Sequence, residues 1–299
     1  MPINTPKEVT DGYAEASKAK ASSPAWRLFV LAVAAGVLIG LGAVTSSTAA
    51  HGLPDLGGGV GPAHGLEDAG MVRLVSGLIF PIGLMMVIML GTELFTGNAL
   101  MVTAAIQGKI TWGALGRNWA IVFAGNLVGS VGLAALMAFF GQLSIGGGEL
   151  AVYTAKVAAA KDSLPWLNAF VLGAFCNVMV CIAVYLSSTA HDTAGRLLAI
   201  FFPIMGFVTC GFEHCVADMY YVPAGIFAAM NPAYAPLIAD AGINTAALDF
   251  GTFLTANLVP VTLGNIVGGV AVGVVMYACH GTKGRRAFER SVQEAADEA

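Results

Sequence analysis

The chain has 299 residues, of which 57% are hydrophobic and only 11% are charged. Ordinary soluble domains carry about 25% charged residues, so this composition excludes a soluble globular protein and indicates an integral membrane protein. The formal net charge of −4 is spread along the chain without a basic patch. We therefore expect the lipid bilayer, and no nucleic acid, among the partners.

The first 24 residues are polar and precede the first apolar run. Thr5–Glu8 has the pattern of a capping box with Pro at the first helical position, which predicts a short helix to about Lys20. The alternative is a frayed polar tail. We divide the chain into a cytoplasmic N-terminal amphipathic segment (1–24), a transmembrane transporter domain (25–281) and a cytoplasmic tail (282–299).

A transmembrane helix needs about 20 mostly apolar residues. Six runs in the chain meet this need: Trp26–Thr48, Met71–Gln107, Trp119–Phe140, Leu164–Ser188, Leu197–Ala229 and Phe250–His280. The second and fifth runs are too long for one plain span and carry polar residues at their middle. This pattern indicates a helix broken inside the membrane rather than two separate crossings.

The distribution of Lys and Arg predicts the orientation. Eleven of the 14 flank the spans on one side and three lie on the other side, at Arg73, Lys156 and Lys161. Because Lys and Arg are enriched in cytoplasmic loops, both termini are expected in the cytoplasm. We expect a multi-pass protein of a bacterial-type plasma (inner) membrane.

The two halves of the chain repeat one another. Gly91-Thr92-Glu93 in the second run is matched 120 residues later by Gly211-Phe212-Glu213 in the fifth, and Gly125–Gly129 in the third by Gly264–Gly268 in the sixth. With three spans in each half, the two copies have opposite orientations. Inverted repeats that each contain a broken helix are typical of transporters, with the pathway near the midplane. The expected fold is an all-α, six-helix membrane fold.

Two polar clusters at membrane depth mark a candidate pathway, because polar groups there are costly. In the first cluster, Gly91–Asn98, the Thr96 hydroxyl can bind an anion and Asn98 can cap the half-helix that follows. The free N–H groups of such a half-helix suit an anion. The alternative is a kink that is sealed by its own side chains.

The second cluster, Gly211–Asp218, contains His214, the single His of five inside a predicted span. A neutral imidazole can donate a hydrogen bond to a passing anion or give it a proton. We expect Glu213 to bind freed backbone N–H groups, since a carboxylate repels an anionic substrate. The alternative for His214 is a hydrogen-bonded structural residue.

A metal site is the main competing interpretation of the second cluster. His214 and Asp218 are spaced i, i+4, which could place two metal ligands on one helix face. A third ligand and an H-E-x-x-H pattern are absent from the sequence, and the five Cys show no zinc-site spacing. We expect no metal, cofactor or catalytic residue, and keep an intramembrane metalloenzyme as the alternative of a different class.

Five stretches, in order from the second to the sixth span, resemble the formate/nitrite transporter family. They are Leu94–Thr96, Ile110–Gly113 with Asn118 and Trp119, Asn177–Cys181, Gly211–His214 and Asn257–Asn265. The resemblance covers nearly the whole chain beyond the N-terminal segment. It implies an aquaporin-like fold and a homopentamer with one pore in each subunit.

The resemblance also implies residue roles. His214 is similar to the central pore histidine, Thr96 to the threonine that faces it, and Lys161 to an outer-vestibule lysine that attracts anions. Asn177 and Glu213 are similar to residues that hold the histidine, with help from Asn265. The apolar constrictions would be formed by Phe80, Leu84, Leu94, Phe95, Val180 and Phe207. The N-terminal segment resembles one proposed to gate such pores at low pH.

One residue departs from the family pattern. Asp218 stands where the family usually has a neutral Asn, one turn after the histidine. A carboxylate that faced the imidazole would favour its protonated form, whereas one that pointed away would leave it unchanged.

The expected function is passage of small monovalent anions. An anion meets a large desolvation cost in an apolar constriction, so we expect His214, through Thr96 and water, to lend the substrate a proton. Formate is the favoured substrate because Glu93, Gly97 and the long segment before the sixth span are more similar to formate-type members. Nitrite and hydrosulfide are the alternatives within the family, followed by acetate and lactate.

Overall fold

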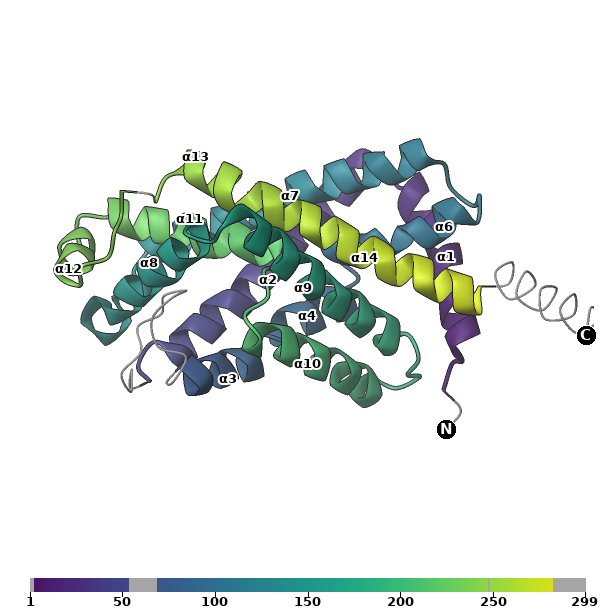
Figure 1. Cartoon of the computed structure of the whole chain (residues 1–299), viewed down its shortest axis with the longest axis horizontal. Coiled ribbons are helices and arrows are strands. Elements are labelled where there is room, and N and C mark those ends of the chain that lie inside the picture. The colour runs from purple at the N-terminus through teal and green to yellow at the C-terminus, as the bar shows by residue number, and fades with distance from the viewer. Residues whose placement is uncertain (1–2, 54–68, 247, 282–299) are drawn as a thin grey trace, which may run out of the picture.

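A computed structural model describes residues 3–53, 69–246 and 248–281 (Figure 1). The regular elements of these residues are all helical. The helices are α1 (Pro6–Ser22), α2 (Ala25–Ala50), α3 (Ala69–Ile79), α4 (Ile82–Leu90), α5 (Phe95–Asn98), α6 (Val102–Ile106), α7 (Trp112–Phe139), α8 (Glu149–Asp162), α9 (Trp166–Ser187), α10 (Thr193–Thr209), α11 (Cys215–Met230), α12 (Ala235–Asp240), α13 (Phe250–Thr252) and α14 (Val259–His280). The proposed C-terminal tail, 282–299, lies outside the described residues.

Five helical segments of the described chain are long and apolar enough to cross a membrane. They are Ala25–Ala50, Gly70–Leu90, Trp112–Phe139, Trp166–Ser187 and Phe250–His280. The remaining predicted span is divided between α10 and α11, both shorter apolar helices. The arrangement therefore agrees with the six predicted spans, and two of them are broken where the sequence places polar residues.

The third span begins at Trp112, earlier than the predicted start at Trp119. Thr111 explains the difference, because its side chain accepts a hydrogen bond from the Ala114 N–H at 3.1 Å and caps the helix. The helix therefore includes the residues between Trp112 and Trp119, among them Arg117, which precede the apolar run.

The predicted N-terminal helix is confirmed. The Thr5 hydroxyl accepts from the Glu8 N–H while the Glu8 carboxylate accepts from the Thr5 N–H, which forms the capping box. Figure 1 shows α1 and α6 at one end of the molecule and α8 and α12 at the opposite end. We call these the α1 end and the α8 end.

Both helix breaks begin at a glycine with a left-handed backbone. Gly91 has φ 64° and Gly211 has φ 70°, a conformation that side chains with a Cβ rarely adopt. The next residues, Thr92 and Phe212, donate their N–H groups back to carbonyls of the preceding helix at 3.1 and 3.0 Å. Each helix therefore stops in the same way, and the chain continues as an extended loop.

The repeated glycines bring helix pairs into backbone contact. A Cβ on Gly129 in α7 would lie 2.1 Å from the Val33 carbonyl oxygen of α2. A Cβ on Gly268 in α14 would lie 2.0 Å from the Ala174 carbonyl oxygen of α9. The α2–α7 and α9–α14 pairs are thus equivalent, and small residues allow this close approach in a membrane protein.

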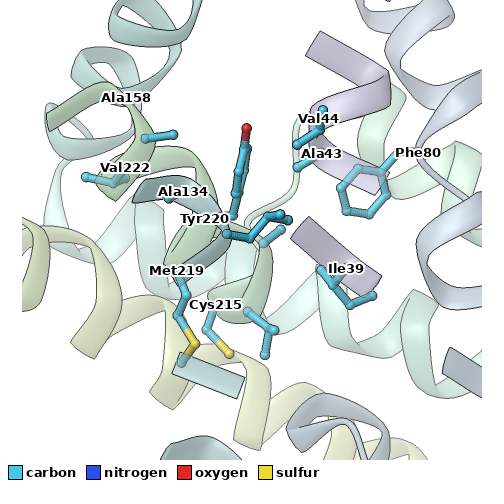
Figure 2. Packing of buried hydrophobic residues seen from close by; sticks show 14 of the residues in the cluster. Ile39, Ala43, Val44, Phe80, Ala134, Ala158, Cys215, Met219, Tyr220 and Val222 are labelled. Atoms are coloured by element: carbon cyan, nitrogen blue, oxygen red, sulfur yellow. The ribbon is translucent and has the colours of Figure 1, made fainter. Parts of the chain in front are cut away.

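The largest buried apolar cluster joins helices of both halves. Figure 2 shows Ile39, Ala43 and Val44 of α2 beside Tyr220 of α11, and Met219 belongs to the same cluster. Helices α7 and α8 add small side chains to the same cluster. This packing fixes the start of α11, and hence the break before it, against the first repeat.

Candidate functional site

Asn126 braces the loop at the first break. Its amide oxygen accepts the Phe95 N–H at 2.9 Å, and its Nδ2 donates to the carbonyl oxygens of Ala32 and Glu93 at 2.7 and 3.0 Å. The Phe95 N–H and the Glu93 carbonyl are backbone groups that the broken helix leaves without helical bonds, whereas Ala32 belongs to the unbroken helix α2. The asparagine of the first Gly-Asn-x-Val-Gly motif therefore fixes the loop in place of backbone pairing.

Asn265 braces the second loop in the same way. It accepts the Cys215 N–H at 2.9 Å and donates to the carbonyl oxygens of Gly173 and Glu213 at 2.7 and 3.0 Å. The predicted help of Asn265 to the histidine is consequently indirect. It holds the residues on either side of His214 in the chain.

His214 lies at the centre, between the two loops. Its Nδ1 accepts the Ala217 N–H at 3.0 Å and caps α11, so the ring hydrogen of a neutral imidazole resides on Nε2. Nε2 lies 2.9 Å from the Thr96 hydroxyl, and the ring stacks on Phe207 with centroids 6.0 Å apart. The structure thus brings together the predicted pair from the two repeats.

Asn177 contacts Thr96 rather than the imidazole. Its Nδ2 donates to the Thr96 carbonyl at 3.2 Å and to the Asn265 carbonyl at 2.6 Å. The sequence-based role of holding His214 is therefore revised: Asn177 positions the residue that His214 binds.

Glu213 binds a lysine, not the backbone N–H groups expected from the sequence. Its Oε2 lies 2.8 Å from Lys161 Nζ, and Asp218 Oδ1 lies 2.8 Å from the same nitrogen. Among the described residues, the Glu213 carboxylate makes no contact with the imidazole. Its predicted role of holding His214 is therefore limited to its position as the preceding residue in the chain. We call Lys161, Glu213 and Asp218 the α8-end cluster.

A matching cluster, which the sequence interpretation missed, lies at the other break. Lys20 Nζ lies 3.0 Å from Glu93 Oε2 and donates to Asn98 Oδ1 at 2.8 Å, while Asn98 Nδ2 donates to Glu93 at 2.7 Å. Asn98 precedes the 3-10 turn Ala99–Met101 but makes no side-chain cap bond to it, so its predicted capping of the half-helix that follows is wrong. We call Lys20, Glu93 and Asn98 the α1-end cluster.

The sequence does contain a signal for Lys20. Lys20 and Lys161 each begin a Lys-x-Ser-x-Pro stretch, and the two stretches are 141 residues apart. The same spacing separates Leu31 from Leu172, whose carbonyls accept the N–H groups of Glu93 and Glu213 at 3.3 and 3.4 Å. The helix pairs α1–α2 and α8–α9 are therefore equivalent parts of the repeat.

The six predicted constriction residues are all buried, none more than 4% exposed: Phe80, Leu84, Leu94, Phe95, Val180 and Phe207. Phe80 meets Phe207 edge to face, with ring centroids 5.7 Å apart, beside the imidazole. Leu84 and Leu94 line a cavity of about 210 Å³ that Tyr13 and Lys20 also line. Apolar side chains thus separate His214 from the α1 end.

Helix α1 covers this cavity. The Tyr13 hydroxyl donates to the Gly97 carbonyl at 2.9 Å, and Thr10 lies 2.7 Å from the Tyr185 hydroxyl. Together with the Lys20 ion pair, these contacts hold the N-terminal helix directly on the first break.

Asp162, next to the α8-end cluster, is a buried carboxyl group without a hydrogen-bond partner in the described part of the chain. Burial, with a further contribution from the nearby Asp249 carboxylate, raises the pKa of Asp162 to about 7. Within residues 3–53, 69–246 and 248–281, no group of three His, Cys, Asp or Glu side chains could hold a metal.

Comparison with known protein families gives one match that spans most of the chain. The model described as "Formate/nitrite transporter" matches residues 7–279. Among curated relatives, "Formate channel FocA" of Haemophilus influenzae is 37% identical over 276 residues, covering 90% of this chain and 92% of its own. "Formate channel FocA" of Escherichia coli K12 is 34% identical over 271 residues, with 89% and 90% covered.

Two solved structures are similar to the whole fold. A "Pentameric formate channel with formate bound" has a TM-score of 0.70 and 35% identity, covering 85% of this chain and 95% of its own. An "FNT family ion channel" has a TM-score of 0.73 and 28% identity, with 90% and 97% covered.

Proposed function

From the premise that the chain belongs to the formate/nitrite transporter family, we propose that it conducts small monovalent anions, with formate as the main substrate. The observation that carries this proposal is the contact between Thr96 and His214, buried where the two breaks meet. The relatives named as formate channels favour formate over nitrite and hydrosulfide. Acetate and lactate are larger candidates for the same pathway.

The first step is attraction of the anion by a lysine. The side chain of Lys161 is 16% exposed, so its ammonium is partly desolvated and its field is weakly screened. At the other break, Lys20 is in the equivalent place. A substrate would then meet a cation on each side of the apolar segment.

The second step takes place at His214. Its Nε2–H, which points to the Thr96 hydroxyl, can turn to a carboxylate oxygen of the substrate. A neutral acid crosses the apolar residues around Phe80 and Phe207 at a lower cost than its anion. We therefore propose that formate passes this point as formic acid, with its proton carried along.

The source of that proton follows from the bonds of the ring. If His214 lends its Nε2 proton, Nδ1 has to take up another and release the Ala217 N–H. If the substrate instead arrives with its own proton, His214 serves as hydrogen-bond donor only. In both cases one proton moves with each anion.

The proposal extends to assembly and location. The similar pentameric formate channel favours a homopentamer with a pore in each subunit, and exposed apolar side chains such as Phe140 and Phe202 suit lipid or neighbouring subunits. We propose a plasma-membrane location with both termini, and hence the α1 end, in the cytoplasm. Residues 1–24 would then form a cytoplasmic segment beside the 25–281 transporter domain, and the contacts of α1 with the first break support a gating role for it.

The test is coupled transport in liposomes. Purified protein is reconstituted with a pH-sensitive dye inside, and an inward formate gradient is applied at an outside pH of 6. We expect formate uptake and acidification of the lumen, both faster than in protein-free liposomes, which report leakage of formic acid. Formate uptake with no acidification beyond that background would contradict the proton-carrying step, and absence of uptake would contradict the channel.

A further inference from the structure

The two clusters at the helix breaks differ in one position. Glu93 and Glu213 are equivalent, as are Lys20 and Lys161, but Asn98 of the α1-end cluster is replaced by Asp218 in the α8-end cluster. The spacing from Glu to Asn and from Glu to Asp is the same. The clusters therefore have the same layout and a different number of carboxyl groups.

At the α1 end, Asn98 satisfies both neighbours. Its amide oxygen accepts from Lys20, and its Nδ2 donates to Glu93 Oε2 at 2.7 Å. An ammonium, a carboxylate and a neutral amide thus form a cluster whose formal charge is zero. The Lys20 ammonium and the Asn98 Nδ2 each find an acceptor within the cluster.

At the α8 end, Asp218 contacts the equivalent groups. Its Oδ1 lies 2.8 Å from Lys161 Nζ, the same nitrogen that Glu213 Oε2 contacts at 2.8 Å. An ionised carboxylate has no hydrogen to donate, whereas a carboxylic acid can donate its O–H as the Asn98 amide donates its N–H. Only the protonated form of Asp218 reproduces the bonding of Asn98.

Burial makes the same form favourable. Asp218 is 0% exposed and Glu213 is 6% exposed, so two buried carboxylates would share one ammonium. Like charges in close contact and out of water disfavour full ionisation, and such pairs hold one proton between them. Lys161 is the cation that contacts both carboxyl groups, at 2.8 Å each.

Several titratable groups surround this pair of carboxyl groups. Helices α8, α9 and α11 supply the titratable neighbours, which are Lys161, Asp162, Cys176, His214, Cys215 and Tyr221. Lys161 is the cation in contact with the pair, and the guanidinium of Arg73 on α3 packs against Gly211, two residues before Glu213. Among the described residues, Asp162 has no hydrogen-bond partner. The α8-end cluster is thus net negative if both of its carboxyl groups are ionised.

We propose that Glu213 and Asp218 hold one exchangeable proton between them. The charge of the α8-end cluster, and with it the electrostatic barrier to anion entry, then depends on pH. With the proton bound, the cluster is neutral like the α1-end cluster, and Lys161 attracts the substrate. When the proton leaves at higher pH, the cluster carries one negative charge and repels it. The predicted effect on transport rests on the proposed function. The presence of the shared proton is independent of that function.

Infrared spectroscopy of the reconstituted protein tests the proton directly. A protonated buried carboxyl gives a C=O band that shifts in D₂O. Comparison of the natural chain with Asp218→Asn at pH 7 cancels the band of other acids, including Asp162. We expect a band that is present in the natural chain and lost in Asp218→Asn. A natural chain without it, or equal bands in both proteins, would overturn the proposal.

The reciprocal variant checks the equivalence of the clusters. Asn98→Asp should add a second such band, and no additional band would contradict the bonding pattern from which the proposal is derived. Formate flux should fall as the pH on the α8 side rises. The fall should be steeper in the natural chain than in Asp218→Asn by about tenfold per pH unit, which corresponds to the loss of one proton. Equal slopes of flux against pH in the two proteins would overturn the proposed effect on anion entry. An intact infrared band in a protein without any flux would contradict the proposed function alone.

Discussion

The Thr96 hydroxyl and His214 Nε2, separated by 118 positions in the chain, lie 2.9 Å apart and join the broken segments of the two repeats. Neither side chain could be placed there by a continuous helix, because both follow a left-handed glycine and an extended loop. Asn126 and Asn265 fix the backbone of these two loops. The pair is therefore preorganised for a polar substrate.

Removal of the Thr96 hydroxyl should reduce formate flux. In Thr96→Val the Nε2–H of His214 loses its buried partner, and an unmet buried donor costs about 1–3 kcal/mol. We expect a decrease of about tenfold or more at an outside pH of 6, measured in proteoliposomes. Thr103→Val is the matched control, because that buried hydroxyl donates to the nearby Leu100 carbonyl and not to a residue of the pathway in the described part of the chain. Equal flux in both variants would contradict the role of Thr96.

Loss of Lys20 should slow transport and weaken the fold. Without this ammonium, the buried Glu93 carboxylate keeps only the Asn98 amide, and it repels an anion at the α1 end. Lys20→Met should lower formate flux by about an order of magnitude, as a unit charge several Å away in a poorly screened site requires. Lys18→Met, on the same helix in an exposed pair with Glu15, is the control. Unchanged flux in Lys20→Met would refute the role of the α1-end cluster.

The backbone contact at Gly268 should tolerate no side chain. An added Cβ would lie 2.0 Å from the Ala174 carbonyl oxygen, so α9 and α14 would have to separate. Gly268→Ala should lower the free energy of unfolding by about 1–3 kcal/mol or prevent assembly. Gly132→Ala, where the new Cβ meets no atom within 4 Å, should instead gain about 0.5–1 kcal/mol. Thermal unfolding in detergent measures both, and a harmless Gly268→Ala would show that the helix contact is looser.

Asp162 should make stability depend on pH. Its folded pKa is raised to about 7, above that of an unfolded Asp, so the folded state binds the extra proton. Stability is therefore highest at low pH and falls as the pH rises from about 4 to 7. Asp162→Asn removes this loss, so its melting temperature should exceed that of the natural chain more at pH 8 than at pH 5. The exposed Asp240→Asn is the control, and a pH-independent difference for Asp162→Asn would contradict the assignment.

Much of the fold was predictable because membrane helices obey strong rules. The length of apolar runs gave the spans, and Gly91 and Gly211 gave the breaks, since only glycine readily adopts a left-handed conformation. The contact of His214 with Thr96 was expected from the family resemblance. Periodicity alone would not have distinguished it from a buried structural histidine.

The clusters at the two ends were not predictable in the same way. Lys20 lies in a polar helix and has the pattern of a solvated residue, and its contact with Glu93 depends on how α1 folds back onto the break. Similarly, Glu213 could be assigned to free N–H groups from sequence, but Asn265 serves those groups instead and leaves the carboxylate for Lys161. Contacts between segments that pack only in three dimensions carry little local sequence signal.

The most direct measurement compares formate, nitrite and hydrosulfide flux through the reconstituted protein from pH 4 to pH 8, against protein-free liposomes. We expect formate flux to be the largest of the three and to rise as the outside pH falls. Flux of nitrite or hydrosulfide without formate would contradict the substrate assignment and leave the fold and the His214 site intact. No flux of any of the three anions would contradict the central claim.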